Sequence, residues 1–373
     1  MSEEMGRKIE IGSRVIIEGY VLLSIFGHPR APGSECENNS RAAESYGAAQ
    51  AKEGSPTDTN SYDEAAISSE SQDTAITALV SKLPRREGWS QQLVLYKNYW
   101  INPLASCASG TSFKPRHDDI ILASNPKCGT TWMKALAFTI TNRSRYEFGN
   151  NHPLLSRHPQ ELVPFMEIHH DTNDDPNYLE TLPSPRLFTT HMPLSLFPES
   201  IDASGRRVMY VCREPNDVFV SWWHFANKFG CKEHNIDLES ALDMFIQGFS
   251  SYGPFWEHCL EYWRQSVTSP YNVLFLKYED MISEPVKHVI IKTRNEAEDG
   301  VPEEVVRLCS FEKLSGLHAN QTRETIRFHN IVFDKSVFFR NGVVGDWVNH
   351  MTEKMGKKID CVMEEKLKGS GLV

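Results

Sequence analysis

The chain has 373 residues, of which 40% are hydrophobic and 24% are charged, as in globular proteins with one large domain or two smaller ones. Its formal net charge of −10 argues against a general nucleic-acid-binding protein. The eight cysteines show no Cys-x-x-Cys or Cys/His ligand spacing, so we expect reduced thiols and no zinc site.

The N-terminal part is expected to lie outside the folded domain. Residues 28–75 are rich in Ser, Ala, Glu, Asn, Gly and Pro, and such a segment cannot bury enough apolar surface to offset its ordering entropy. The apolar run 15–27 contains Glu18 and is too short to span a bilayer. We therefore predict a largely disordered extension over residues 1–78, a folded domain over 79–373, no membrane anchor and a cytoplasmic location.

Short apolar runs alternate with helical patterns along the rest of the chain. Strands are predicted over 120–123, 186–190, 208–212 and 273–277, and helices over 130–141, 215–227, 238–249 and 252–265. This alternation predicts a single α/β domain whose central parallel sheet is flanked by helices on both faces. Ligands of such sheets bind beyond the carboxyl ends of the strands, which is where His191 and Arg213 occur in the sequence.

The loop Pro-Lys-Cys-Gly-Thr-Thr-Trp at 126–132 joins the first of these strands to its helix. A helix start offers free backbone N–H groups and the positive end of the helix dipole, which together suit a phosphate. Lys127, Thr130 and Thr131 add side-chain donors. A Walker A loop ends Gly-Lys-Ser/Thr, whereas Lys127 precedes Gly129, so this is not an ordinary ATP or GTP loop.

Four further segments follow in order, each with a plainer interpretation when taken alone. Thr-Thr-His-Met-Pro at 189–193 could hold a structural His191, and Cys-Arg-Glu-Pro-Asn-Asp at 212–217 could form a surface ion pair. Leu-Lys-Tyr-Glu-Asp at 276–280 with Cys-Ser-Phe at 309–311 could be core packing. The last is Arg-Asn-Gly-Val-Val-Gly-Asp-Trp at 340–347. Together and in this order the five segments resemble the cytosolic sulfotransferase family, in particular the plant soluble sulfotransferases, over about residues 83–373.

The resemblance implies a P-loop-like fold and transfer of a sulfonate group from 3′-phosphoadenosine 5′-phosphosulfate (PAPS) to a hydroxyl or amine, without a metal. It implies that His191 is the general base and that Lys127 stabilises the leaving phosphate. Trp100 and Phe165 would line the acceptor pocket. The positions that would bind PAPS are Lys127, Cys128, Gly129, Thr130, Thr131, Trp132, Arg213, Ser221, Tyr278, Cys309, Ser310, Phe311, Arg340, Asn341 and Gly342.

The chain departs from the family pattern at several points. Cys128 and Asn341 replace a usual Ser and Lys, and Thr189 replaces a Lys of many animal members. The segment 289–300 is shorter and more polar than in the family. These departures leave open a degenerate, non-catalytic PAP- or PAPS-binding member, and a nucleotide-dependent kinase on the same fold is a further alternative. For an active enzyme we expect a small apolar hydroxylated acceptor (a flavonoid, steroid or hydroxyjasmonate-like molecule), no nucleic-acid or membrane partner, and a monomer or weak homodimer.

Overall fold

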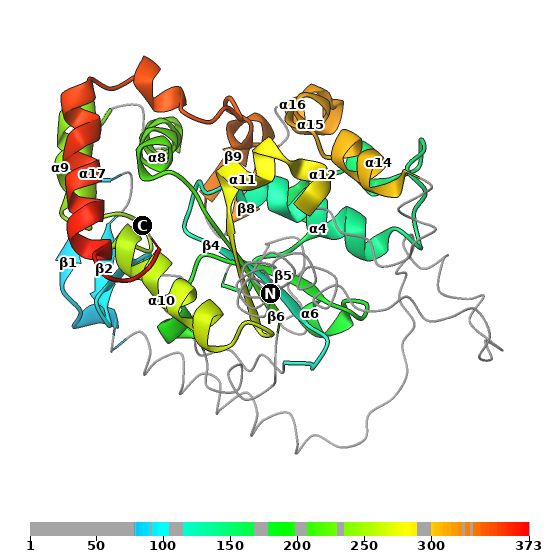
Figure 1. Cartoon of the computed structure of the whole chain (residues 1–373), viewed down its shortest axis with the longest axis horizontal. Helices are drawn as coiled ribbons and strands as arrows, with labels where there is room; N and C mark the ends of the chain where they lie inside the picture. Colours follow the sequence, from blue (N-terminus) through cyan, green and yellow to red (C-terminus); the bar gives the residue numbers. More distant parts are fainter. Residues whose placement is uncertain are drawn as a thin grey trace, which may run out of the picture.

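A computed structural model describes residues 78, 80–89, 92–103, 115–167, 178–197, 207–229, 235–288, 300–322, 325–328 and 331–372 (Figure 1). The predicted extension, except Ala78, and the polar segment 289–299 lie outside the described residues. No helix in the described ranges is both long and apolar enough to cross a membrane. The five described cysteines carry free thiols.

A four-stranded parallel sheet forms the centre of the domain. Its strands lie in the order β5 (Leu187–Thr190), β4 (Ile120–Ser124), β6 (Arg207–Cys212) and β7 (Val273–Lys277). All four predicted strands are confirmed to within one residue at each end. Because the strands are parallel, their carboxyl ends, and the loops that follow them, meet at one edge of the sheet.

Alternate residues of each strand feed two separate apolar layers. In β4, Ile121 and Ala123 join one core cluster, and Ile120 and Leu122 join the other. Figure 1 shows helices on both sides of the sheet, which confirms the predicted α/β architecture. The helices of the first layer are α8 (Pro215–Phe229), α9 (Leu238–Ile246), α10 (Phe255–Thr268) and α17 (Glu353–Leu367). Those of the second are α4 (Thr130–Asn142), α11 (Tyr278–Ser283), α14 (Val301–Leu308) and α15 (Phe311–Gly316).

The predictions for α9 and α10 were wrong at the segment between them. The sequence predicted helices over 238–249 and 252–265, but α9 ends at Ile246 and α10 begins at Phe255. Gly248 and Tyr252 have φ values of 77° and 61°, a left-handed conformation that a helix cannot continue. Pro254 is then the residue before the first turn of α10. Tyr252 is thereby placed in a turn rather than on a helix.

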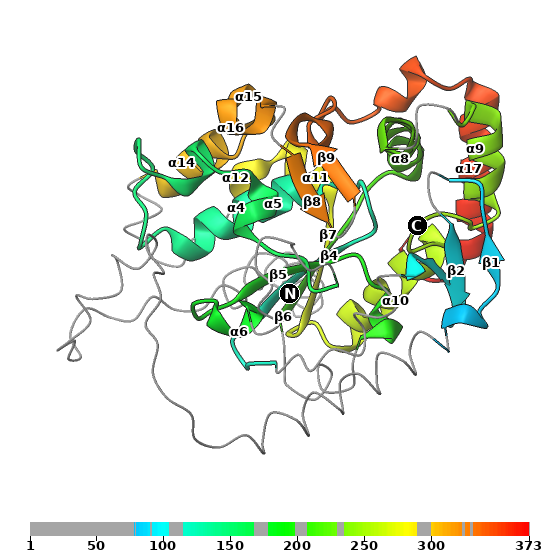
Figure 2. The same cartoon turned by 180° about the vertical axis from the view of Figure 1, so that it is seen from behind.

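A small antiparallel sheet, which the sequence analysis did not predict, lies beside this turn. It consists of β1 (Arg85–Arg86), β2 (Leu93–Tyr96) and β3 (Tyr99–Ile101). The hydrogen bond from Trp89 Nε1 to the carbonyl of Phe249 (2.7 Å) holds it next to α9 (Figure 2). The remaining elements are short: η1 (Pro153–Leu155), α5 (Pro159–Leu162), α6 (Tyr178–Thr181), η2 (Leu194–Leu196), α12 (Pro285–His288), α16 (His318–Gln321), β8 (Thr325–Phe328), β9 (Ile331–Asp334), η3 (Lys335–Phe338) and η4 (Asp346–Asn349).

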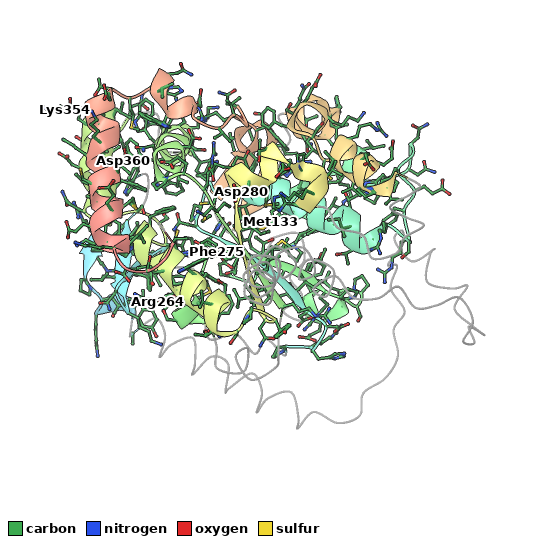
Figure 3. All side chains as sticks on the ribbon, viewed as in Figure 1. Met133, Arg264, Phe275, Asp280, Lys354 and Asp360 are labelled. Atoms are coloured by element: carbon green, nitrogen blue, oxygen red, sulfur yellow. The ribbon has the colours of Figure 1, made fainter. Side chains whose placement is uncertain are left out.

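The side chains show the same division between interior and surface. Met133 of α4 and Phe275 of β7 lie next to the central sheet, whereas Lys354 lies on the outer helix α17 (Figure 3). The flanking helices therefore turn apolar side chains toward the sheet and polar side chains such as Lys354 outward.

Candidate active site

The loop after β4 is shaped by two left-handed residues. Lys127 has φ 73° and Gly129 has φ 98°. A Cβ added to Gly129 would lie 2.6 Å from the Tyr278 ring, so only glycine fits there. Gly129 is the N-cap of α4 and no side chain caps this helix, which also has no acidic residue in its first turn. The first N–H groups of α4 therefore remain available for an anion.

Lys127 brings a positive charge to this loop. Its Nζ lies 4.2 Å from the centre of the Phe225 ring, and its described contacts include no ion pair. Burial, followed by the charges of Arg213, Arg340 and Lys228, lowers the pKa of Lys127 to about 7. An arriving anion would favour the charged ammonium, so the site gains positive charge when it is filled.

The other loop side chains divide between the site and the core. Thr131 Oγ1 accepts a hydrogen bond from Gln160 Nε2 (3.1 Å), and Thr130 Oγ1 is bonded to Ser124 Oγ (2.8 Å). Cys128 is fully buried, and burial raises the pKa of its thiol well above the ordinary value. The thiol therefore belongs to the apolar core, and only the backbone of Cys128 faces the loop.

Arg213 links the loop to the C-terminal segment. One guanidinium nitrogen donates to the carbonyl of Lys127 (3.4 Å), and the other donates to the carbonyl of Val343 (3.0 Å) and to Asp217 Oδ2 (3.2 Å). The guanidinium also lies 4.7 Å from the centre of the Tyr278 ring. Its Nε is buried and has no hydrogen-bond partner among the described residues. A buried, unsatisfied donor next to a cationic loop suits an anionic ligand.

Asp217 fixes the C-terminal loop around this arginine. Besides Arg213, it accepts the backbone N–H groups of Gly345 (2.8 Å) and Trp347 (3.0 Å). Within the same loop Arg340 pairs with Asp346 at 2.5 Å. Arg213 and Arg340, which lie 127 positions apart in the sequence, are thus held in one cationic cluster with Lys127.

The aromatic candidates surround the same loops. Trp132 and Tyr278 meet edge to face with ring centres 5.7 Å apart. Gly342 has φ 70°, and a Cβ there would lie 2.4 Å from Phe311, so the loop backbone rests on this ring. The contact with Gly342 joins Phe311 to the C-terminal loop that carries Arg340.

The remaining predicted cofactor positions are less directly placed. The thiol of Cys309 is buried against Thr139 Oγ1 (3.4 Å), and burial raises its pKa to about 12. Ser310 caps α15 by accepting the N–H of Lys313 (3.2 Å). Ser221 is buried in α8, two turns beyond Arg213, and Asn341 precedes Gly342 in the C-terminal loop. The structure gives Cys309 and Ser310 structural contacts of their own.

His191 lies directly after β5 and is fixed by three hydrogen bonds. Its Nδ1 lies 2.7 Å from the carbonyl oxygen of Ser124, which can only accept, so Nδ1 carries the proton and Nε2 has the free lone pair. Its backbone N–H donates to Glu167 Oε1 (2.6 Å), and its carbonyl accepts from His258 Nε2 (2.9 Å). Burial lowers the pKa of His191 to about 3. The imidazole is therefore neutral, with one defined tautomer.

Aromatic rings enclose His191. Phe165 lies 4.9 Å away between ring centres and Tyr252 lies 5.7 Å away. The predicted pocket residue Phe165 is thus next to His191, whereas Trp100 packs on Phe249 (4.9 Å). Trp100 also pairs with the turn of Tyr252, accepting its N–H at 2.7 Å. It therefore supports the ring that touches His191.

The sequence analysis did not identify several residues that support the site residues through hydrogen bonds and ring contacts. Glu167, Gln160 and Tyr252 contact site residues only through the tertiary fold, whereas Asp217 also pairs with Arg213 four positions before it. For Asp217 a signal existed, because an acidic residue in the first turn of α8 follows Arg213 by four positions. Among the described residues, no three His, Cys, Asp or Glu side chains are grouped as a metal site.

Comparison with known proteins identifies the family of this chain. The sulfotransferase domain matches residues 117–371. Cytosolic sulfotransferase 1 of Arabidopsis thaliana is 42% identical over 311 residues, covering 79% of this chain and 93% of the relative. Cytosolic sulfotransferase 17 of the same plant is 40% identical over 309 residues, covering 79% and 89%. The chain therefore belongs to the sulfotransferase family, and the sequence-based prediction of a sulfotransferase enzyme is confirmed.

Solved structures support the same fold. A sulphotransferase structure from Arabidopsis thaliana has a TM-score of 0.62 and 33% identity, covering 79% of this chain and 94% of its own. A mouse sulfotransferase complexed with PAP has a TM-score of 0.57 at 23% identity, covering 75% and 95%. The second likeness speaks for the fold alone. Together they confirm the P-loop-like α/β class that was predicted.

Proposed function

We propose that this sulfotransferase uses PAPS as its donor and transfers the sulfonate group to a hydroxyl of a small apolar molecule. The observation that carries the proposal is the cationic cluster of Lys127, Arg213 and Arg340 around the uncapped start of α4. It suits a nucleotide with two separate phosphates, because the loop and the arginines present two groups of donors. The mouse sulfotransferase that shares this fold is itself complexed with PAP.

PAPS would supply the sulfonate group and a phosphate leaving group. The N–H groups of α4, Thr130 and Thr131 would hold the 5′-phosphate, with Lys127 beside the leaving oxygen. Arg213 and Arg340 would hold the 3′-phosphate. Trp132, Tyr278 and Phe311 offer aromatic faces for the adenine. No step of this scheme requires a metal, because Lys127 and the backbone dipoles stabilise the developing charge.

His191 would act as the general base on the acceptor hydroxyl. Its Nδ1–H is committed to Ser124, so Nε2 is the atom that takes the proton. The neutral state that burial imposes keeps this lone pair available at pH 7. Phe165 and Tyr252 beside the imidazole favour an apolar, flat acceptor such as a flavonoid, a steroid or a hydroxyjasmonate-like molecule.

A transfer assay with ³⁵S-labelled PAPS and a panel of phenols, steroids and hydroxylated fatty-acid derivatives tests this function. We expect labelled product from at least one acceptor and none from His191→Ala. PAP binding without any transfer would favour the degenerate, non-catalytic member. Phosphate transfer from ATP with Mg²⁺ would instead favour the kinase. Names of the relatives support a cytoplasmic location, and a monomer or weak homodimer remains our prediction.

A further inference from the structure

A buried chain of hydrogen bonds runs from α4 back to its own first turn. Lys134 is 0% exposed and Gln160, at the start of α5, is 2% exposed. Lys134 Nζ donates to Gln160 Oε1, and Gln160 Nε2 donates to Thr131 Oγ1 at 3.1 Å. Neither Lys134 nor Gln160 belongs to the five motifs, but their hydrogen bonds connect them to Thr131 of the phosphate loop.

Lys134 fixes the direction of this chain. The Lys134 amine donates to the Gln160 oxygen, which leaves the Gln160 NH₂ group to donate to Thr131. Burial lowers the pKa of Lys134 well below its ordinary value, and the carboxylate of Glu167 opposes that shift. The Phe165 ring, whose centre lies 3.7 Å from Nζ, also favours the charged amine.

The last member of the chain is Thr131. Its Oγ1 already accepts from Gln160, so its own O–H proton is free to point away from Gln160. Thr131 stands in the first turn of α4, where the helix has no side-chain cap and no acidic residue. A hydroxyl oriented in advance donates to an anion without reorganisation.

We propose that Lys134 and Gln160 are positioning residues that orient the Thr131 hydroxyl toward a 5′-phosphate oxygen of the nucleotide. This inference rests on the proposed function, since it takes the nucleotide phosphate to lie at the start of α4. Lys134 and Gln160 act through Thr131 and contact no reacting atom. The buried polar atoms of Lys134 and Gln160 fix the direction in which the Thr131 hydroxyl donates its hydrogen bond.

Gln160→Glu separates this role from a purely structural one. A carboxylate at position 160 is nearly the same size as the amide and still accepts from Lys134, so we expect the fold to be retained. It also accepts from the Thr131 hydroxyl, which reverses the last bond of the chain and withdraws the donor from the phosphate. We expect a cooperative thermal transition like that of the wild type together with a Kd for PAP raised by about tenfold or more in calorimetry.

A double-mutant cycle with Thr131→Val separates loss of the Thr131 donor from simple repulsion between the new carboxylate and the nucleotide phosphate. In that background Gln160→Glu should change the Kd by no more than about twofold, because no hydroxyl remains to be redirected. An equal loss in both backgrounds would mean charge repulsion and would overturn the proposal, as would a wild-type Kd in Gln160→Glu. Should that variant not fold, Lys134→Met replaces it in the same cycle. Absence of PAP binding by the wild-type chain would instead refute the proposed function itself.

Discussion

Nucleotide binding should weaken as the pH rises above 7, because it takes up a proton at Lys127. In the free protein, burial and the neighbouring charges of Arg213 and Arg340 lower the pKa of this amine to about 7. A phosphate next to the amine favours its charged form and returns the pKa toward its ordinary value. Between these two pKa values, binding is therefore coupled to protonation of Lys127.

The size of the effect follows from that pKa. The Kd for PAP should rise by about fivefold from pH 7 to 8 and by about tenfold from pH 8 to 9, and it should level off below pH 7. The phosphates do not contribute, since their second pKa is about 6. Calorimetry at pH 8 in two buffers with different ionisation enthalpies should report an uptake of about 0.9 proton per nucleotide.

Lys127→Arg is the matched control, because a guanidinium stays charged over this whole range. The variant should bind PAP with a Kd that hardly changes between pH 7 and 9. A wild-type Kd that is equally flat, with no dependence of the heat on the buffer, would refute the assignment of a depressed pKa to a phosphate-contacting Lys127.

Three further substitutions test other parts of the site. His191→Ala should lower kcat by about 10²–10⁴-fold in a transfer assay while leaving the Kd for PAP within about twofold, because only the base is lost. Gly342→Ala should lower the melting temperature and weaken PAP binding, since the added Cβ would lie 2.4 Å from Phe311 at a φ of 70°. Asp217→Asn should cost about 1–3 kcal/mol in urea unfolding and weaken PAP binding, because an amide has one oxygen for three donors, among them Arg213.

Matched variants exist for two of these substitutions. Gly149→Ala meets no atom within 4 Å and should be neutral in both assays. Asp243→Asn changes a carboxylate that is 61% exposed and should alter stability by less than about 0.5 kcal/mol. Strong loss of PAP binding in His191→Ala, or full activity in it, would mean that His191 is not the base. Wild-type behaviour of Gly342→Ala or Asp217→Asn would contradict the geometry of the C-terminal loop.

The central sheet was readable from the sequence because β4, β6 and β7 are short, largely apolar runs next to polar residues, and β5 (Leu-Phe-Thr-Thr) consists of residues with high strand propensity. The segment between α9 and α10 was misassigned although Gly248, Gly253 and Pro254 mark a break in the helical pattern. The left-handed conformation of Tyr252 within it carries no such signal in the sequence. The hairpin β2–β3 turns at Lys97 and Asn98, both with positive φ, and lacks the glycine that usually marks such a turn.

The candidate site was readable where its residues directly follow strands or form a glycine loop, as Lys127, His191 and Arg213 do. The orientation of some side chains and the contacts between distant segments could not be predicted from the sequence. The sequence pattern does not say that the thiols of Cys128 and Cys309 face the core. Nor does it pair Glu167 with the backbone of His191, or Gln160 with Thr131, because these contacts join separate segments through the fold.

PAPS-dependent transfer requires a site that distinguishes a nucleotide with a 3′-phosphate from one without it. Calorimetry with PAP and with AMP, which lacks only that phosphate, tests this on the full chain. We predict that PAP binds at least about 100-fold more tightly than AMP, and that Arg213→Ala removes most of this difference. Equal affinities for PAP and AMP, or binding of neither by a cooperatively folded protein, would contradict the proposal that this sulfotransferase uses PAPS through the Arg213 cluster.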